Sequence, residues 1–220
     1  MIGAGDPDRR SPGQHARATV LRLRMRTLVA LGVLAVVTTE FGRAFGLHSA
    51  LFVGSELALL ASMFVVLRYV VPLVERRDRG AAGEEHVGGL LAQLDGADWS
   101  VIHDASFGRG NVDHIVCGPG GLFTVETKSR SGPIKVRAIH GGVLRQAQQE
   151  RETIERVTGE HVEALLVFSR AWVDKPLARR RGVRVMPARM LLSYLGEHAE
   201  KLSSEQVRAA RARIVAALED

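Results

Sequence analysis

Hydrophobic and polar positions divide the chain into an apolar N-terminal part and a mixed C-terminal part. The apolar part, residues 27–74, contains only four charged side chains: Glu40, Arg43, Glu56 and Arg68. From residue 80 onward, apolar residues recur at the spacings of amphipathic helices and half-buried strands. The boundary is a short basic cluster, Arg76, Arg77 and Arg79. The pattern therefore predicts one folded domain preceded by a separate apolar segment.

The apolar part predicts two transmembrane helices that form a hairpin. The stretches 27–47 and 49–74 are both long enough to cross a bilayer core, which takes about 20 apolar residues, and the connection between them is very short. The tail 1–26 and the segment after residue 74 are both rich in arginine. By the positive-inside rule, we expect the N-terminus and the C-terminal domain to lie in the cytoplasm, with the hairpin in the cytoplasmic (inner) membrane.

An alternative for the same two stretches is a pair of helices that pack on a partner protein or in a dimer. The carboxylates of Glu40 and Glu56, which are costly in a bilayer, favour this alternative. Either the hairpin or the last helix of the chain would then provide a homo-oligomer interface.

The remaining residues predict helices and strands in alternation. Helices are expected from residue 83 to the glycine at 96, over 142–158, and after a capping box formed by Ser203 and Gln206. Strands are expected at 101–104, 112–117, 122–128, 164–168 and 182–186. This order predicts an α/β or α+β domain with a mixed sheet flanked by helices, over residues 80–190 and followed by a helical extension at 191–220.

Two of the predicted strands form a hairpin that brings acidic residues together. If the turn is centred between Pro119 and Gly120, the residue opposite Asp113 is Glu126, and Lys128 lies on the same face as Glu126. Like charges directly opposite each other destabilise a sheet, so this pair requires a cation or a shared proton. Oxygen ligands without thiolate or clustered imidazole favour Mg²⁺ or Mn²⁺.

This arrangement is suited to phosphodiester hydrolysis. A metal held by Asp113 and Glu126 would polarise the phosphodiester and lower the pKa of a bound water. Lys128 would orient or deprotonate that water, or neutralise charge in the transition state. The alternative is that Glu126 and Lys128 are polar residues on a solvated strand face, because an Asp followed by Glu-x-Lys is frequent by chance.

Three spaced segments of the domain resemble the NERD family, the nuclease-related domains. They are GAAGE at 80–84, GRGNVDHIV at 108–116 and GPGGLFTVETKS at 118–129. The resemblance covers roughly residues 80–188 and implies a restriction-endonuclease-like core of the PD-(D/E)xK superfamily.

The resemblance also implies roles for individual residues. Asp113 and Glu126 would be metal ligands, although many relatives have Asp where this chain has Glu126. Lys128 would be the catalytic lysine, and Glu84 the helix carboxylate that completes the acidic cluster. Related nucleases often carry a glutamine on the helix after the hairpin, and Gln146 is the candidate because it lies beside the apolar stripe of that helix.

Composition narrows the class of partner. Of the 220 residues, 46% are hydrophobic and 25% charged, which excludes a disordered chain. The single cysteine, Cys117, excludes an intrachain disulfide framework. The net charge of +6 favours phosphate-bearing partners, either nucleic acid or anionic lipid.

Two basic regions are candidates for contact with nucleic acid. Arg109 lies in a glycine-rich turn, where it could grip a phosphate or be a solvated loop residue. Segment 170–189 contains Trp172 and a run of arginines that could follow a nucleic-acid backbone, Arg179, Arg180 and Arg181. The alternatives for this segment are contact with anionic lipid headgroups and a solvated face.

Together these features predict a membrane-anchored, divalent-metal-dependent nuclease that hydrolyses DNA or RNA. The alternative is a membrane-anchored module that binds nucleic acid or protein without catalysis.

Overall fold

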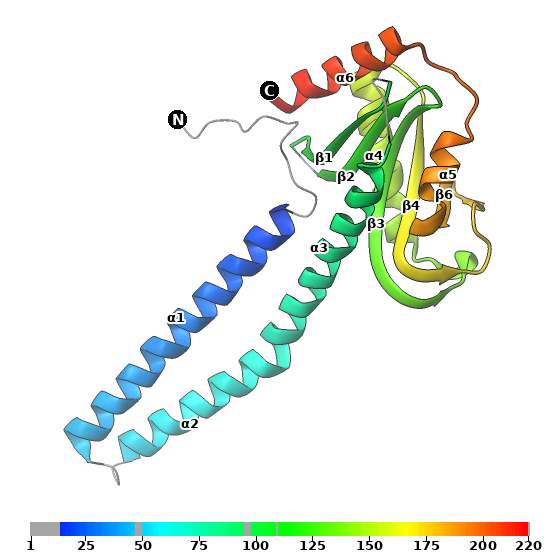
Figure 1. The fold of residues 1–220 in the computed structure, drawn as a ribbon. Helices are drawn as coiled ribbons and strands as arrows, with labels where there is room; N and C mark the ends of the chain where they lie inside the picture. The colour runs from blue at the N-terminus through cyan, green and yellow to red at the C-terminus, as the bar shows by residue number, and fades with distance from the viewer. Residues whose placement is uncertain (1–13, 47–49, 95–97, 109, 220) are drawn as a thin grey trace. The chain divides into compact units, whose positions relative to one another are not determined.

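The computed structural model describes residues 14–46, 50–94, 98–108 and 110–219. The described residues form two compact units that divide between residues 79 and 80. The first unit is helical, and the second contains a sheet with helices on both faces (Figure 1).

The helices of the first unit are longer than the sequence predicts. Helix α1 (Gln14–Phe45) begins well before residue 27. Helix α2 (Ala50–Val65) continues through a π-helical turn (η2, Val66–Val70) into α3 (Val71–Leu91), instead of ending at residue 74. The predicted transmembrane segment and the first helix of the C-terminal domain are therefore parts of one helix.

The π-helical turn allows the helix to pass Pro72 without ending. Proline lacks the main-chain N–H that an α-helix uses and clashes with the preceding turn. The N–H of Val71, the residue before it, donates to the carbonyl of Val66, which is the wider π pattern. A local π turn is one of the known ways in which a helix accommodates such a residue.

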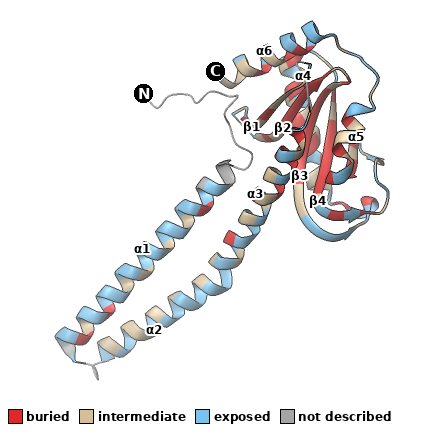
Figure 2. Cartoon of the chain, in the orientation of Figure 1, coloured by how far each residue is buried: buried red, intermediate tan, exposed pale blue. Residues whose placement is uncertain are grey.

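Within the described residues, only one helix, Phe52–Leu91, is long and apolar enough to cross a membrane, where the sequence predicts two. Helix α1 has an apolar middle with charged residues on both sides of it. Arg26 precedes this middle, and Arg43 pairs with Glu40 at 3.4 Å after it. Many apolar side chains on both helices are exposed nevertheless (Figure 2), among them Leu28, Val33, Val36, Leu57, Phe64 and Leu67.

The second unit contains, in its described residues, a six-stranded mixed sheet in the order β1-β2-β3-β4-β6-β5. Its strands are β1 (Ser100–Ser106), β2 (Asn111–Gly118), β3 (Gly121–Ile134), β4 (Val162–Val173), β5 (Arg179–Arg180) and β6 (Val183–Pro187). Strands β1, β2 and β3 are antiparallel neighbours, β3, β4 and β6 are parallel, and β5 is antiparallel to β6. The predicted mixed sheet flanked by helices is confirmed.

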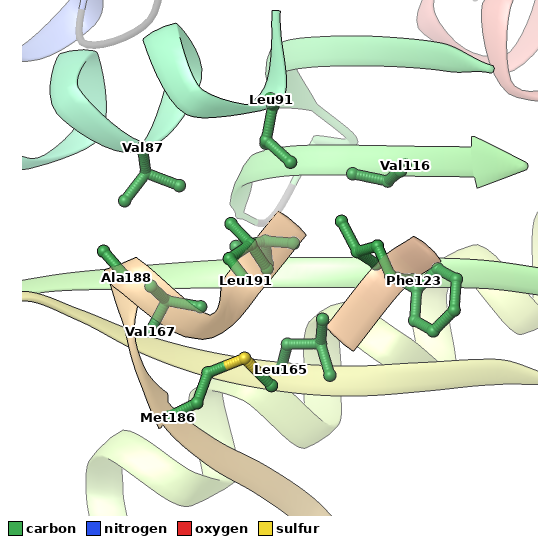
Figure 3. Close-up of a cluster of buried hydrophobic side chains, with 11 residues drawn as sticks. Val87, Leu91, Val116, Phe123, Leu165, Val167, Met186, Ala188 and Leu191 are labelled. Carbon is green, nitrogen blue, oxygen red and sulfur yellow. The ribbon is translucent and has the colours of Figure 1, made fainter. Parts of the chain in front are cut away.

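Helices cover both faces of this sheet. The end of α3 and the short helix α5 (Leu191–Gly196) pack on one face, where Val87, Leu91 and Leu191 join Phe123 and Leu165 in a buried cluster (Figure 3). Helices α4 (Gly141–Thr158) and α6 (Ser204–Glu219) pack on the other face, over alternate residues of the same strands.

Side chains of the C-terminal helices contribute to this core. Leu195 of α5 and Ile214 of α6 are completely or almost completely buried. The predicted capping box is present: the N–H of Ser203 donates to Oε1 of Gln206 at 2.9 Å, and the N–H of Gln206 donates to Oγ of Ser203 at 3.3 Å.

The predicted hairpin register is confirmed. Strands β2 and β3 are joined by the two-residue turn at Pro119 and Gly120, so that Gly118 pairs with Gly121 and His114 with Val125. If this register is continued by one step, Asp113 is opposite Glu126, and the N–H of Thr127, the next residue, donates to Oδ2 of Asp113. Strand β3 extends six residues beyond the predicted end at 128, past an irregularity between Lys128 and Ser131.

Candidate functional site

Acidic residues form a row across three neighbouring strands of the sheet. In the β1–β2 ladder, His103 pairs with His114 and Ala105 with Val112, which places Asp104 across from Asp113. In the β2–β3 ladder, His114 pairs with Val125, and the next step of the same register sets Asp113 across from Glu126. The sequence predicted the second pairing but not the first.

Asp113 is held against β3 by a main-chain hydrogen bond. The N–H of Thr127 donates to Oδ2 of Asp113 at 2.7 Å. Burial raises the pKa of Asp113 well above its ordinary value, and the carboxylates of Glu126 and Glu84 raise it further, against the lowering effects of the Thr127 bond and Lys128. Asp113 therefore needs a bound proton or a nearby cation, as expected for two acids on neighbouring strands.

Glu126 is the most buried acid of the row, with only 1% of its surface exposed. Its Oε1 accepts a hydrogen bond from Nζ of Lys128, two residues along β3, while Oε2 is buried and has no hydrogen-bond partner among the described residues. Lys128 also donates to Oε1 of Gln146 on α4 at 3.3 Å. The structure therefore brings Glu126, Lys128 and Gln146 together, as predicted.

The charge state of Lys128 follows from these neighbours. Burial lowers the pKa of Lys128, but the charge and hydrogen bond of Glu126, followed by the charges of Asp113 and Glu150, outweigh burial and leave the pKa raised. Lys128 is therefore a cation at neutral pH, which suits neutralisation of negative charge and opposes removal of a proton by this side chain.

Glu84 reaches the site because α3 approaches the sheet closely one residue earlier. A Cβ at Gly83 would lie 2.8 Å from Cβ of Ser129 and 2.9 Å from Oγ of Ser169, so only glycine fits this contact. Burial raises the pKa of Glu84, and Asp104 and Glu126 raise it further, while Lys128 lowers it. The predicted helix carboxylate is thus electrostatically part of the acidic cluster.

Glu150, on the same helix as Gln146 and one turn later, is a site residue that the sequence analysis missed. Its side chain is buried, and its carboxyl group interacts with Gln146 and with Glu126, so that a proton can lie between the two acids. Burial and the nearby charge of Glu126 raise the pKa of Glu150 to about 10. The spacing of Gln146 and Glu150 on one helix face was the available signal.

Asp104 is the second missed residue. It is buried in the edge strand β1 and has a positive φ of 50°, which is uncommon for a residue other than glycine. Its Oδ1 accepts a hydrogen bond from the side-chain amide of Asn111 at the start of β2. Such backbone strain is concentrated at functional sites, so this position belongs in the candidate site.

The site fits a divalent cation by the chemistry of its donors. The buried carboxyl groups of Glu126 and Glu150 lie against each other and need a proton or a cation between them, because an uncompensated buried carboxylate is costly. Oxygen donors of this kind suit Mg²⁺ or Mn²⁺. Over the described residues, however, no group of three or more His, Cys, Asp or Glu side chains is already positioned to hold a metal, and Lys128 is the cation that contacts Glu126.

The arginines predicted to bind nucleic acid lie elsewhere and have protein partners. Arg179 donates to Oε1 of Glu163 at 2.7 Å, and Arg180 donates to the main-chain carbonyls of Val136 and Ile139. Arg181 forms the tight β5–β6 turn with Gly182, and its carbonyl accepts a hydrogen bond from the side chain of Gln148. Trp172 is 55% exposed. Arg109 lies outside the described residues.

Comparison with known proteins places this geometry in context. Solved structures similar to the chain include a repair endonuclease from Pyrococcus abyssi, at 18% identity and a TM-score of 0.31 over 55% of this chain and 47% of that chain. The EndoMS–dsDNA2 complex gives 18% identity and a TM-score of 0.31 over 56% and 45%. SfsA from Pyrococcus furiosus in complex with Ca²⁺ gives 17% identity and a TM-score of 0.26 over 62% and 53%. The chain thus spans about half the length of these structures.

The search of curated proteins finds no match. The scan against family models does find one, and the matched segment contains Glu84, Asp113, Glu126, Lys128, Gln146 and Glu150. Residues 79–169 of this chain match the family described as NERD, the nuclease-related domain, which confirms the resemblance inferred from the sequence.

Proposed function

We propose that this protein is a membrane-anchored, divalent-metal-dependent hydrolase of phosphodiester bonds in nucleic acid. The observation that carries the proposal is the hydrogen bond from the N–H of Thr127 that holds Asp113 beside Glu126, together with the contact of Lys128 with Glu126. Two acids and a cation lie together on adjacent strands, and the buried Oε2 of Glu126 has no hydrogen-bond donor among the described residues, which is an arrangement that like charges alone would destabilise.

In this proposal, Asp113 and Glu126 hold the metal and Glu84 completes the ligand set. The bound metal would supply Lewis-acid activation of the phosphate and of a water nucleophile. Lys128, held as a cation between Glu126 and Gln146, would donate a hydrogen bond to the phosphate oxygens as negative charge builds up on them. Gln146 fixes the position of the ammonium group, and Glu150 provides a nearby carboxyl group that holds or releases a proton.

The membrane anchor is proposed for residues 27–74. It is supported by the helix Phe52–Leu91, which is apolar and long enough to span a bilayer. Exposed valine, leucine and phenylalanine side chains along α1 and α2 support it too, because apolar surface on this scale marks contact with lipid or with another protein. The arginines of α1 and of segment 76–79 would then face the anionic inner leaflet.

Cleavage by the full-length protein in detergent tests the hydrolase. Single- and double-stranded DNA and RNA are each incubated with Mg²⁺, Mn²⁺ or EDTA, and Glu126→Gln is compared with wild type. Glu152→Gln, on an exposed position of α4, is the matched carboxylate-to-amide control. We expect cleavage that requires a divalent metal, survives Glu152→Gln and is lost in Glu126→Gln. Cleavage that persists in EDTA or in Glu126→Gln would reject the site.

Sodium carbonate extraction of membranes tests the anchor. An inserted hairpin stays in the pellet, whereas a helix pair that packs on a partner protein is released into the supernatant. Protease treatment of spheroplasts and of inverted vesicles tests the orientation, and we expect the C-terminal domain to be cleaved only in inverted vesicles.

A second candidate is a non-catalytic, membrane-anchored module that binds nucleic acid or protein. The ion pair of Lys128 with Glu126 favours it, because this pair neutralises Glu126 without a metal. In that case, Mg²⁺ would neither bind nor stabilise the protein.

A further inference from the structure

A cavity of 260 Å³ opens beside Lys128, outside the row of acids. Its walls are the end of β3, the short helix η3 (Val136–Ala138) and the first turn of α4. The irregularity in β3 between Lys128 and Ser131 redirects the strand, and β3 then continues beside β4 up to Ile134. The far wall of the cavity is therefore hydrogen-bonded sheet.

Arg180, which the sequence predicted to bind nucleic acid, supports this wall instead, together with Asp174. Arg180 donates to the carbonyls of Val136 and Ile139, and Oδ1 of Asp174 accepts the N–H of Val136 at 2.9 Å. These contacts fix the turn that carries Lys135, Ala138 and His140 around the cavity. Arg180 is thus a positioning residue for the cavity wall.

The cavity is suited to an anion. Lys128, Arg130, Lys135 and His140 line it, and among the described residues no acid does. The structure gives Arg130 and Lys135 no ion pair within the described ranges, in contrast to Arg179 and Arg184, which both contact Glu163. The N-terminus of the 18-residue helix α4 adds a favourable dipole to these charges.

The rest of the lining is apolar. Ile134 and Val143, which are half-buried, and the edge of the almost fully buried Phe168 contribute apolar surface of the kind that an unstacked nucleobase contacts. The volume is slightly below the roughly 300–1,000 Å³ of typical small-molecule sites, so the cavity has room for one nucleotide and not for a duplex.

We propose that this cavity binds one unpaired nucleotide, with its phosphate at Lys128 and Arg130 and its base against Ile134, Val143 and Phe168. The preferred substrate is therefore a single strand, or an unpaired nucleotide next to the bond that is cleaved. The inference rests on the proposed function for the identity of the reaction, but binding at the cavity does not require cleavage.

Fluorescence anisotropy with the full-length protein in EDTA tests the inference. The probe is a labelled oligothymidylate of about 12 nucleotides, within the usual site sizes of single-strand binders, and the competitor is the same sequence as a blunt duplex. Arg130→Gln/Lys135→Gln removes charge from the cavity. Ala138→Trp fills the cavity and leaves its charges in place. Lys201→Gln/Arg208→Gln, at exposed positions away from the cavity, is the charge-matched control.

We expect wild type to bind the single strand more tightly than the duplex. Arg130→Gln/Lys135→Gln should weaken single-strand binding roughly 10- to 30-fold at moderate salt and lower the salt slope by about 1.4, the value for two phosphate contacts on a single strand. Ala138→Trp should weaken binding at least about fivefold with little change in salt slope, because it removes base contact. The control should bind as wild type does.

Two results would overturn the proposal that the cavity binds a nucleotide. One is equal affinity for single strand and duplex, and the other is an Ala138→Trp variant that keeps its thermal unfolding midpoint and binds as wild type does. The use of EDTA separates this inference from the proposed function, since removal of the metal should abolish cleavage by wild type and keep single-strand binding. If wild type does not cleave but the cavity variants still lose binding, the hydrolase fails and the nucleotide site stands.

Discussion

The main-chain N–H of Thr127 donates a 2.7 Å hydrogen bond to Oδ2 of Asp113, which ties the carboxylate of one strand to its neighbour. The donor belongs to the backbone of the residue directly after Glu126. The two acids therefore stay close together, and their repulsion cannot relax by a rotation of Asp113 away from the sheet without the loss of this bond. The repulsion is instead relieved by a proton, by Lys128 or by a metal.

The first prediction is that Asp113→Asn makes the metal-free protein more stable and removes its stabilisation by Mg²⁺. The amide oxygen can still accept the N–H of Thr127, so the local geometry survives while one negative charge is lost. In EDTA, we expect the variant to unfold at a higher temperature than wild type. Mg²⁺ at 100 times its dissociation constant should stabilise wild type by about 2.7 kcal/mol and the variant hardly at all. Differential scanning fluorimetry with and without Mg²⁺ measures both effects, and an equal Mg²⁺ response of the two proteins would contradict the assignment.

The second prediction concerns the ion pair of Lys128 with Glu126. Glu126 is almost fully buried, so Lys128→Met leaves a buried charge without its partner and should cost about 3–5 kcal/mol in EDTA. Glu126→Gln/Lys128→Met should recover most of this loss, because neither charge remains. Urea unfolding of the double-mutant cycle gives the coupling energy. If the double variant is as unstable as Lys128→Met alone, the loss comes from packing and not from the charge.

The hairpin could be predicted from the sequence because its information is local. The turn is marked by the four consecutive residues Gly118, Pro119, Gly120 and Gly121. A two-residue turn centred on them fixes which residues of the two strands are opposite each other. The positions of Asp113, Glu126 and Lys128 follow from the register alone. Glu84 followed from the resemblance to a family.

Asp104 and Glu150 could not be placed in the same way. The partner of Asp104 depends on the length of the loop 107–110, which the pattern of strands does not specify. Glu150 lies in a polar run of α4 and is buried only because that helix packs over β3 and β4. The extended helix α2–α3 was missed because Pro72 and the arginines after it are ordinary signs of a helix end, and the π turn that overrides them leaves no sequence signal.

The third prediction is that stability falls with rising pH through Glu150. Its pKa is raised from 4.5 to about 10, so the folded protein holds a proton that the unfolded chain releases above about pH 4.5. Between these values, the free energy of unfolding falls by up to about 1.4 kcal/mol per pH unit from this group. Glu150→Gln should flatten the slope by about one proton and raise the unfolding midpoint at pH 8 relative to wild type. Glu152→Gln should leave the slope unchanged, and a Glu150→Gln slope equal to that of wild type would show that Glu150 is ionised in the fold.

The fourth prediction has the opposite sign and concerns His114. Burial, and then the neighbouring His103, lower the pKa of His114 from 6.5 to about 3. The folded protein keeps this imidazole neutral while the unfolded chain takes up a proton below pH 6.5, so stability is lost as the pH falls from 6.5 toward 3. At pH 5 the loss should be about 2 kcal/mol from this residue.

Replacement of His114 by Gln tests this loss of stability at acid pH. The variant should be less stable than wild type at pH 7, because the 2.8 Å contact between Nδ1 of His114 and Nδ1 of His103 is altered, but it should lose less stability between pH 7 and pH 5. His161→Gln is the control, because His161 is 84% exposed. Chemical denaturation at several pH values measures the slopes, and parallel slopes for wild type and His114→Gln would contradict the prediction.

The fifth prediction compares two glycines of α3 that differ only in their surroundings. A methyl group at Gly83 would meet Ser129 and Ser169, and overpacking of this kind costs about 1–3 kcal/mol, whereas nothing lies within 4 Å of a methyl group at Gly89. Gly89→Ala should stabilise the protein by up to about 1 kcal/mol through helix propensity alone. Gly83→Ala should destabilise it and displace the adjacent Glu84, with a loss of metal-dependent cleavage that exceeds the loss of fold at the assay temperature. Gly83→Ala/Ser129→Gly should restore part of both properties, because it removes the nearest obstacle, Cβ of Ser129, and leaves Oγ of Ser169 in place. Equal stability of the two alanine variants would mean that α3 lies further from the sheet than this contact requires, and Glu84 would then lose its place in the acidic cluster.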